Sequence, residues 1–169
     1  VPRTEVVAAG LARVERGRYF TLLGPRQAGK TTCFQLMLRE LATRPDYVGT
    51  WVSFEDLSSA PPEIFWEEVR TQLVNGFRTV APGFELPVLG SVWDLGKLAA
   101  QVKDVLGRRW VLIIDEFDGV PEHVLYDLMH RFRRLYHQKS DHGLHSLALV
   151  GVRNITEVTL DHASPFNIA

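Results

Sequence analysis

Two glycines, a lysine and two threonines directly follow a short apolar segment near the start of the chain. The segment is YFTLL at residues 19–23, and the residues after it read GPRQAGKTT, at 24–32. This spacing fits G-x-x-x-x-G-K-[ST], in which backbone N–H groups surround phosphates. Gly24 and Gly29 permit backbone angles and close approach that a side chain would block, so several N–H groups can point at one anion. The sequence therefore predicts a phosphate-binding loop between a strand and a helix.

Each position of this loop has an expected part in holding a nucleotide. Lys30 supplies a compact cation for the outer phosphates, and Thr31 supplies a hydroxyl for Mg²⁺. The N-terminus of the following helix adds its partial positive charge. The other nucleotide-binding positions of the loop are expected to be Pro25, Arg26, Gln27, Ala28 and Thr32. A chance glycine-rich turn would match the same spacing, so the interpretation depends on a partner motif downstream.

That partner motif is a pair of carboxylates, Asp115 and Glu116, directly after the apolar segment WVLII at 110–114. An aspartate at the carboxyl end of a strand beside the phosphate-loop strand can hold Mg²⁺. The next residue faces the other way, so Glu116 can polarise an attacking water as a general base. A solvated acidic turn is the alternative without function. For Asp118 we expect a bond to the loop backbone or a cap on the next helix.

Arg153 stands immediately after the fourth predicted strand, in LVGVRN. If that strand lies between the phosphate-loop strand and the Asp115 strand, Arg153 projects toward the γ-phosphate. There it could sense that phosphate or stabilise transferred charge. Asn154 is the rival for this role through its amide, and a surface arginine in a loop is the alternative without function.

Histidines invite a metal interpretation that the geometry does not favour. His123, His130 and His137 recur every seventh residue on one predicted helix. Such residues lie about 10 Å apart along the helix axis, too far to share one ion. We expect an exposed or boundary stripe. For His142 and His145 no third ligand is evident, and a polar loop is expected.

Composition and charge are those of a folded domain without a strong electrostatic preference. Apolar residues make up 46% and charged residues 23%, and 19 basic against 20 acidic side chains leave a net charge of −1. A cluster of Arg131, Arg133 and Arg134 could contact nucleic acid or a neighbouring subunit's nucleotide. With so little net charge, a solvated face with acidic partners is favoured.

The chain is expected to be one cytoplasmic domain core spanning residues 1–169, with no second domain. The single cysteine, Cys33, excludes an internal disulfide and fits a reducing compartment. No apolar segment approaches the ~18–20 residues that a membrane helix needs, so no membrane partner is expected. Because the chain begins with Val1 and stops just after SPFNIA, both ends look cut from something longer.

Hydrophobic periodicity predicts alternating strands and helices, which indicates a mostly parallel α/β sheet with helices on both faces. The first helix is expected to be capped by Thr4 and ended by Gly17. The expected strands are 19–23, 47–55, 110–114 and 147–152. The other expected helices are 30–43, 61–77, 95–106 and 121–139. An irregular surface loop is expected at 80–91.

The four segments GPRQAGKTT, VLIIDEFD, LALVGVRN and SPFNIA together resemble the AAA-like ATPase domains of bacterial P-loop proteins, near the STAND signalling group. The resemblance spans essentially the whole chain. It implies a three-layer α/β/α P-loop NTPase sandwich with strand order 1-4-3-2, in which a fifth strand and a helical lid would follow SPFNIA. It also implies a catalytic Glu116, a γ-phosphate sensor at Arg153, and an adenine contact from Pro2 and Arg3.

Two main hypotheses for function follow. The first is an ATPase switch, in which ATP and Mg²⁺ bind at 24–32 and hydrolysis by way of Glu116 resets a conformational signal to other domains of the same chain, with self-association possible. The second is a regulated nucleotide-binding platform with little hydrolysis. A DNA-associated ATPase remains an alternative through Arg131 and its neighbours. A GTPase is disfavoured because no N-K-x-D segment is present, and a kinase because no acceptor site or arginine-rich lid is evident.

Overall fold

Four parallel strands form one sheet in the order β1-β4-β3-β2. They are β1 (Tyr19–Leu23), β2 (Tyr47–Ser53), β3 (Arg109–Asp115) and β4 (Leu144–Gly151). The computed structural model describes residues 3–152 of the chain. The predicted order 1-4-3-2 and the α/β architecture are confirmed, with β4 between the phosphate-loop strand and the Asp115 strand.

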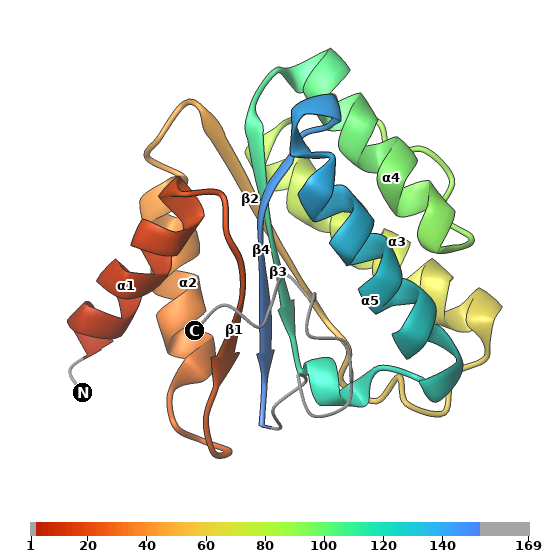
Figure 1. Ribbon diagram of the computed structural model, residues 1–169, viewed down its shortest axis with the longest axis horizontal. Coiled ribbons are helices and arrows are strands. Elements are labelled where there is room, and N and C mark those ends of the chain that lie inside the picture. The colour runs from red at the N-terminus through yellow and green to blue at the C-terminus, as the bar shows by residue number, and fades with distance from the viewer. Residues whose placement is uncertain (1–2, 153–169) are drawn as a thin grey trace.

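Helices cover both faces of the sheet (Figure 1). One face carries α1 and α2, and the other carries α3, α4 and α5. Their bounds are α1 Arg3–Glu15, α2 Lys30–Leu41, α3 Pro62–Val80, α4 Val92–Gln101 and α5 Glu122–His137. A π-helical turn, Val102–Leu106, extends α4, and short 3₁₀ turns lie at Phe117–Gly119 and Lys139–Asp141. The molecule thus has three layers, as the resemblance implied.

The central strand β3 shows why the sheet must be covered on both sides. Trp110, Leu112 and Ile114 point into the larger core, which α3, α4 and α5 complete. Val111 and Ile113 point the other way, into the core beneath α1 and α2. Because successive side chains of a strand alternate between faces, an unbroken apolar segment can only be buried when both faces are covered.

Some predicted bounds were wrong. Helix α1 already includes Arg3, so Thr4 does not cap it, while Gly17 follows its end with a φ of 66° as expected. Strand β4 begins at Leu144 rather than at residue 147, because Leu144 is buried and pairs with Trp110 across the sheet. His145 therefore lies on a strand and not in the polar loop that its sequence context indicated.

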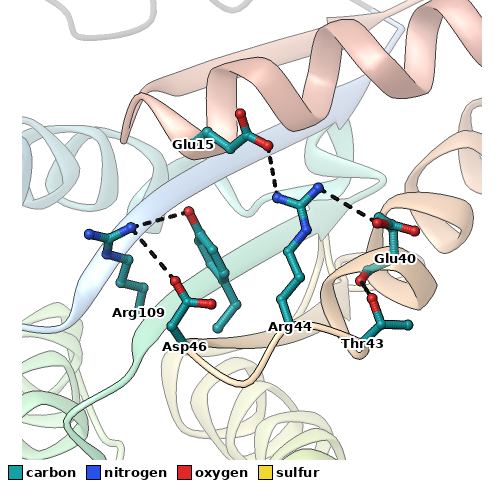
Figure 2. Close-up of polar contacts among 7 residues, drawn as sticks. Glu15, Glu40, Thr43, Arg44, Asp46 and Arg109 are labelled. Carbon is teal, nitrogen blue, oxygen red and sulfur yellow. Dashed lines mark hydrogen bonds and ion pairs between the residues drawn. The ribbon is translucent and has the colours of Figure 1, made fainter.

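A group of ion pairs lies where the strands begin, at the amino end of the sheet. Asp115 lies at the opposite, carboxyl end. Figure 2 shows Arg44, just before β2, reaching Glu15 at the end of α1 and Glu40 on α2, at 2.8 and 3.6 Å. Arg109, the first residue of β3, lies 3.9 Å from Asp46. The ion pairs at the amino end of the sheet link α1 and α2 to the segment before β2, whereas the predicted phosphate loop lies at the carboxyl end.

Candidate functional site

The phosphate loop connects the end of β1 to the start of α2 through a left-handed turn. Gly29 precedes the helix with a φ of 82°, and Gln27 has a φ of 60°. Glycine adopts such angles without strain, whereas other residues do so at a cost. Gly24 donates its N–H to the carbonyl of Gly151 at the end of β4, at 3.3 Å. The loop therefore begins on the sheet and ends at a helix N-terminus, where partial positive charge favours an anion.

The Lys30 ammonium folds back over its own loop. Its Nζ donates to the carbonyl oxygens of Gly24 and Pro25, at 2.7 and 2.6 Å. These are neutral acceptors, and a phosphate oxygen is a stronger partner for an ammonium because both groups are charged. The lysine is thus held at the loop where an anion would meet the backbone N–H groups.

Thr31 and Asp115 meet across the gap between α2 and the end of β3. The Thr31 hydroxyl donates to Asp115 Oδ2 at 3.3 Å, and Asp115 Oδ1 accepts the Glu116 N–H at 2.9 Å. The Asp115 side chain is buried, with 8% of the residue exposed. The structure thus brings together the two residues that the sequence assigned to a metal, although they lie far apart in the chain.

A hydroxyl and a carboxylate at this separation fit Mg²⁺, which prefers oxygen donors. Mg²⁺ in such sites is held by one or two protein oxygens together with substrate phosphates and water. Within residues 3–152 no group of three or more His, Cys, Asp or Glu side chains gathers that could form an all-protein cage. The donor set therefore suits a cation that arrives with a phosphate ligand.

Glu116 directly follows β3 in a left-handed conformation, with a φ of 49°. This conformation costs a non-glycine residue of the order of 1 kcal/mol, and such strain is often found at functional sites. Glu116 is exposed, whereas its neighbour Asp115 is buried. The two neighbouring carboxylates thus differ in their access to solvent.

Asp118 binds the backbone at the end of β4. Its Oδ2 accepts the N–H of Val152 at 2.6 Å, so the bond is to backbone, but at the end of β4 and not within its own loop. Gly151 packs so closely beside this carboxylate that a Cβ there would lie 2.7 Å from Oδ2. Sequence reasoning did not foresee that the partner would be the strand next to the phosphate loop.

The remaining predicted nucleotide contacts lie at the two ends of the chain. The Arg3 guanidinium lies against Gly29, with Nε and Nη2 both 3.4 Å from the place a Cβ would take. An arginine at the start of α1 is thus within reach of the loop. Pro2, Arg153 and Asn154 lie outside the described residues.

The other singled-out side chains lie away from the phosphate loop, on or beside α5. His123, His130 and His137 are exposed, as expected of a surface stripe. Arg131 lies over the ring of Trp93 on α4, with its guanidinium carbon 4.0 Å from the ring centroid. Burial and the charge of Arg134 lower the pKa of Arg131. An aromatic partner for this arginine was not predicted.

His142 is a buried, hydrogen-bonded residue, and not part of the polar loop that its sequence context indicates. Its Nε2 lies 2.6 Å from the carbonyl oxygen of Leu135, and its Nδ1 accepts the Leu144 N–H at 3.0 Å. This arrangement requires the neutral ring with its proton on Nε2. Burial lowers the pKa of His142, in line with that requirement. His142 thus joins the end of α5 to the start of β4 by hydrogen bonds at both ring nitrogens.

No helix within the described part of the chain combines the length and apolarity needed to cross a membrane.

The chain is similar to nucleotide-binding proteins in sequence. Residues 14–159 match the family described as "AAA domain". Over 97 residues the chain is 36% identical to the spermidine/putrescine import ATP-binding protein PotA of Chromobacterium violaceum. That match covers 55% of this chain and 26% of PotA, so the chain is similar to about a quarter of that protein.

Solved structures show the same fold. A Walker-type ATPase of Pyrococcus abyssi matches 95% of this chain and 49% of its own, with a TM-score of 0.66 at 18% identity. Cdc6p of Pyrobaculum aerophilum matches 96% of this chain and 40% of its own length, with a TM-score of 0.60 at 14% identity. A chain of the Drosophila ORC structure with poly(dA/dT) DNA and Cdc6 matches 96% of this chain and 27% of its own length, with a TM-score of 0.65 at 15% identity. The chain spans half or less of each of these proteins.

Proposed function

The chain belongs to the AAA domain family, and from that premise we propose that it binds ATP with Mg²⁺ and hydrolyses it as a nucleotide-driven conformational switch. In this proposal residues 1–169 are a single P-loop ATPase core within a larger protein. The finer assignment to the STAND signalling group is part of the same proposal. Other domains of the protein, or a second copy of it, would receive the signal.

One observation carries the proposal: the Thr31 hydroxyl and the Asp115 carboxylate lie 3.3 Å apart beside a left-handed glycine at a helix N-terminus. Such a site offers backbone N–H groups to phosphates and two oxygen ligands to a cation. When bound, Mg²⁺ would neutralise charge that develops on the phosphate oxygens. Thr31 and Asp115 would hold the cation, and Lys30 would exchange its two carbonyl partners for phosphate oxygens.

The proposed general base is Glu116. Its exposed carboxylate follows the buried Asp115, so it can reach a water on the solvent side of the phosphates. A base must lie within hydrogen-bond reach of the proton that it accepts, and it commonly contributes 10²- to 10⁴-fold in rate. In the proposal, Arg153 senses the γ-phosphate, Arg3 and Pro2 lie over the adenine, and the loop residues 24–32 hold the phosphates.

A pair of substitutions tests binding and chemistry separately. Lys30→Ala removes the cation that meets the phosphates, so we expect ATP affinity to fall about 100-fold in calorimetry. Glu116→Gln keeps the shape of the side chain but cannot accept the proton, so we expect affinity within about 3-fold and hydrolysis at least about 100-fold slower. Lys97→Ala is the matched control, because Lys97 is exposed on α4 and pairs only with Asp94 among the described residues.

The outcomes separate the alternatives. ATP binding by Lys30→Ala as tight as in the parent would refute the phosphate-loop assignment. Equal, measurable hydrolysis by the parent and Glu116→Gln would remove Glu116 as the base. If the parent binds ATP but releases no phosphate above background, the chain is a nucleotide-binding platform, and occupancy itself is the signal.

A further inference from the structure

The turn that carries Glu116 is fixed on one side by the end of β2. Gly119 donates its N–H to the Glu116 carbonyl at 2.9 Å, which closes the turn. Phe117 is buried, and the centroid of its ring lies 5.7 Å from the centroid of the Phe54 ring. Gly119 packs directly on the backbone of Phe54, where a Cβ would lie 2.3 Å from the carbonyl oxygen. The position of this turn is therefore set by packing and not by its sequence alone.

On its other side the same turn is fixed by Asp118. The carboxylate accepts the Val152 N–H at 2.6 Å, a bond strengthened by the negative charge of the acceptor. The carboxylate occupies the space that a side chain at residue 151 would need, since a Cβ on Gly151 would lie 2.7 Å from its Oδ2. Because Gly151 also accepts the N–H of Gly24 at 3.3 Å, the end of β4 touches both the Glu116 turn and the first residue of the phosphate loop.

The direction of the Glu116 side chain depends first on the backbone that carries it, because the left-handed φ of 49° sets where its Cβ points. A misplacement of a reacting group by about 1 Å can cost about 100-fold in rate. A side chain that holds the Glu116 turn against the end of β4 would thus act on hydrolysis without touching the nucleotide.

We propose that Asp118 is a positioning residue that couples the phosphate loop to the general base through the end of β4. The path runs from Gly24 to the Gly151 carbonyl, from the Val152 N–H to the Asp118 carboxylate, and along the turn to Glu116. The kinetic part of this inference rests on the proposed ATP hydrolysis, whereas the contact itself does not. A shift of the phosphate loop on nucleotide binding would reach Glu116 along this path.

The test compares Asp118→Ala with Asp118→Asn in the full-length protein. Alanine removes the acceptor for the Val152 N–H, whereas the asparagine amide oxygen can still accept it. We expect Asp118→Ala to keep ATP affinity within about 3-fold and to lower kcat about 10- to 100-fold, and Asp118→Asn to recover kcat to within about 3-fold of the parent. Asp127→Ala, an exposed aspartate on α5, is the matched control and should leave kcat unchanged.

A second measurement does not depend on hydrolysis. Amide hydrogen exchange should become at least about 10-fold faster at Val152 and measurably faster at Gly24 in Asp118→Ala, but not in Asp118→Asn. The coupling is refuted if the exchange of Val152 and Gly24 is the same in Asp118→Ala as in the parent. Equal impairment of kcat by alanine and asparagine would also refute it, because the acceptor oxygen would then not be the cause. A parent without phosphate release, but with the expected exchange pattern, would instead refute hydrolysis and leave the contact between Asp118 and the end of β4 standing.

Discussion

At the scale of single residues, three glycines of the site have close neighbours that lie far from them in the sequence. Gly119 lies against the Phe54 carbonyl, and Gly151 lies against the Asp118 carboxylate. Gly29 has both a left-handed φ and the Arg3 guanidinium beside it. The rigid backbone of Phe54 excludes a side chain at Gly119, whereas the left-handed φ is what favours glycine at residue 29.

Gly119→Ala should destabilise the protein, because its Cβ would meet the rigid backbone of Phe54 and the turn would have to shift. Overpacking of this kind costs about 1–3 kcal/mol. Urea denaturation monitored by tryptophan fluorescence should show this loss in the free energy of unfolding. Gly90→Ala is the matched control, since the nearest atom to its Cβ would be an Asp94 oxygen at 3.7 Å, and we expect a change within about 0.5 kcal/mol. Equal stability of the two variants would contradict the steric argument.

At the scale of elements, connections depend on buried polar contacts that have no clear sequence signature. His142 joins the carbonyl of Leu135 near the end of α5 to the N–H of Leu144 at the start of β4. His145, the next histidine, lies edge-on to the Tyr47 ring at 5.9 Å, and its pKa is also lowered, first by burial and then by the charge of Arg109. For both rings burial disfavours the charged form.

The depressed pKa of His142 gives a specific dependence of stability on pH. The unfolded state binds the proton more readily than the folded state, so this contribution to stability is fully present above about pH 6.5 and is lost as the pH falls below that value. Protonation of Nδ1 would also break the bond from the Leu144 N–H. The free energy of unfolding of the parent should therefore fall between pH 7 and pH 5.

His142→Asn tests whether His142 causes the loss of stability at low pH, because asparagine does not titrate. We expect a loss of about 1–2 kcal/mol at pH 7.5 and a weaker dependence of stability on pH below 6.5. Replacement of the exposed His130 by glutamine should leave the pH dependence as in the parent. If His142→Asn and the parent lose the same free energy between pH 7 and pH 5, the acid sensitivity comes from other groups.

At the scale of the whole molecule, the two cores contribute far more to stability than the ion pairs at the amino ends of the strands. Ile113 is completely buried under α1 and α2, whereas the side chain of Glu15 is 52% exposed where it meets Arg44. Exposed ion pairs are weakened by water and salt, and they contribute about 0–1 kcal/mol. Buried apolar side chains lose both packing and burial when they are truncated.

Ile113→Ala should therefore cost about 2–5 kcal/mol of the free energy of unfolding, against at most about 1 kcal/mol for Glu15→Ala. The loss in Glu15→Ala should shrink further in 0.5 M NaCl, because salt screens the pair with Arg44. Chemical denaturation at low and high salt measures both effects. A larger loss for Glu15→Ala than for Ile113→Ala would show that the pairs in Figure 2 hold α1 to the sheet.

Much of the architecture is encoded locally and could be predicted. The segments 19–23 and 110–114 are apolar enough to require burial, and the loop spacing with Lys30 and Thr31 fixes the transition from strand to helix. The bounds of β4 were harder, because His145 and Ser146 interrupt its apolar pattern, and Ser146 is accommodated by a bond to the Arg18 carbonyl.

The sequence by itself determined a glycine-rich turn between a strand and a helix, the pair of carboxylates after a buried strand and the alternation of strands and helices, because each depends on neighbours in the chain. Only the tertiary structure decided that Asp118 binds the end of β4, that His142 is buried and neutral, and that Arg131 lies over Trp93. These contacts join residues that are brought together by packing of the sheet and helices. A side chain acquires such a partner only after the surrounding elements have folded, so no local sequence pattern predicts the contact.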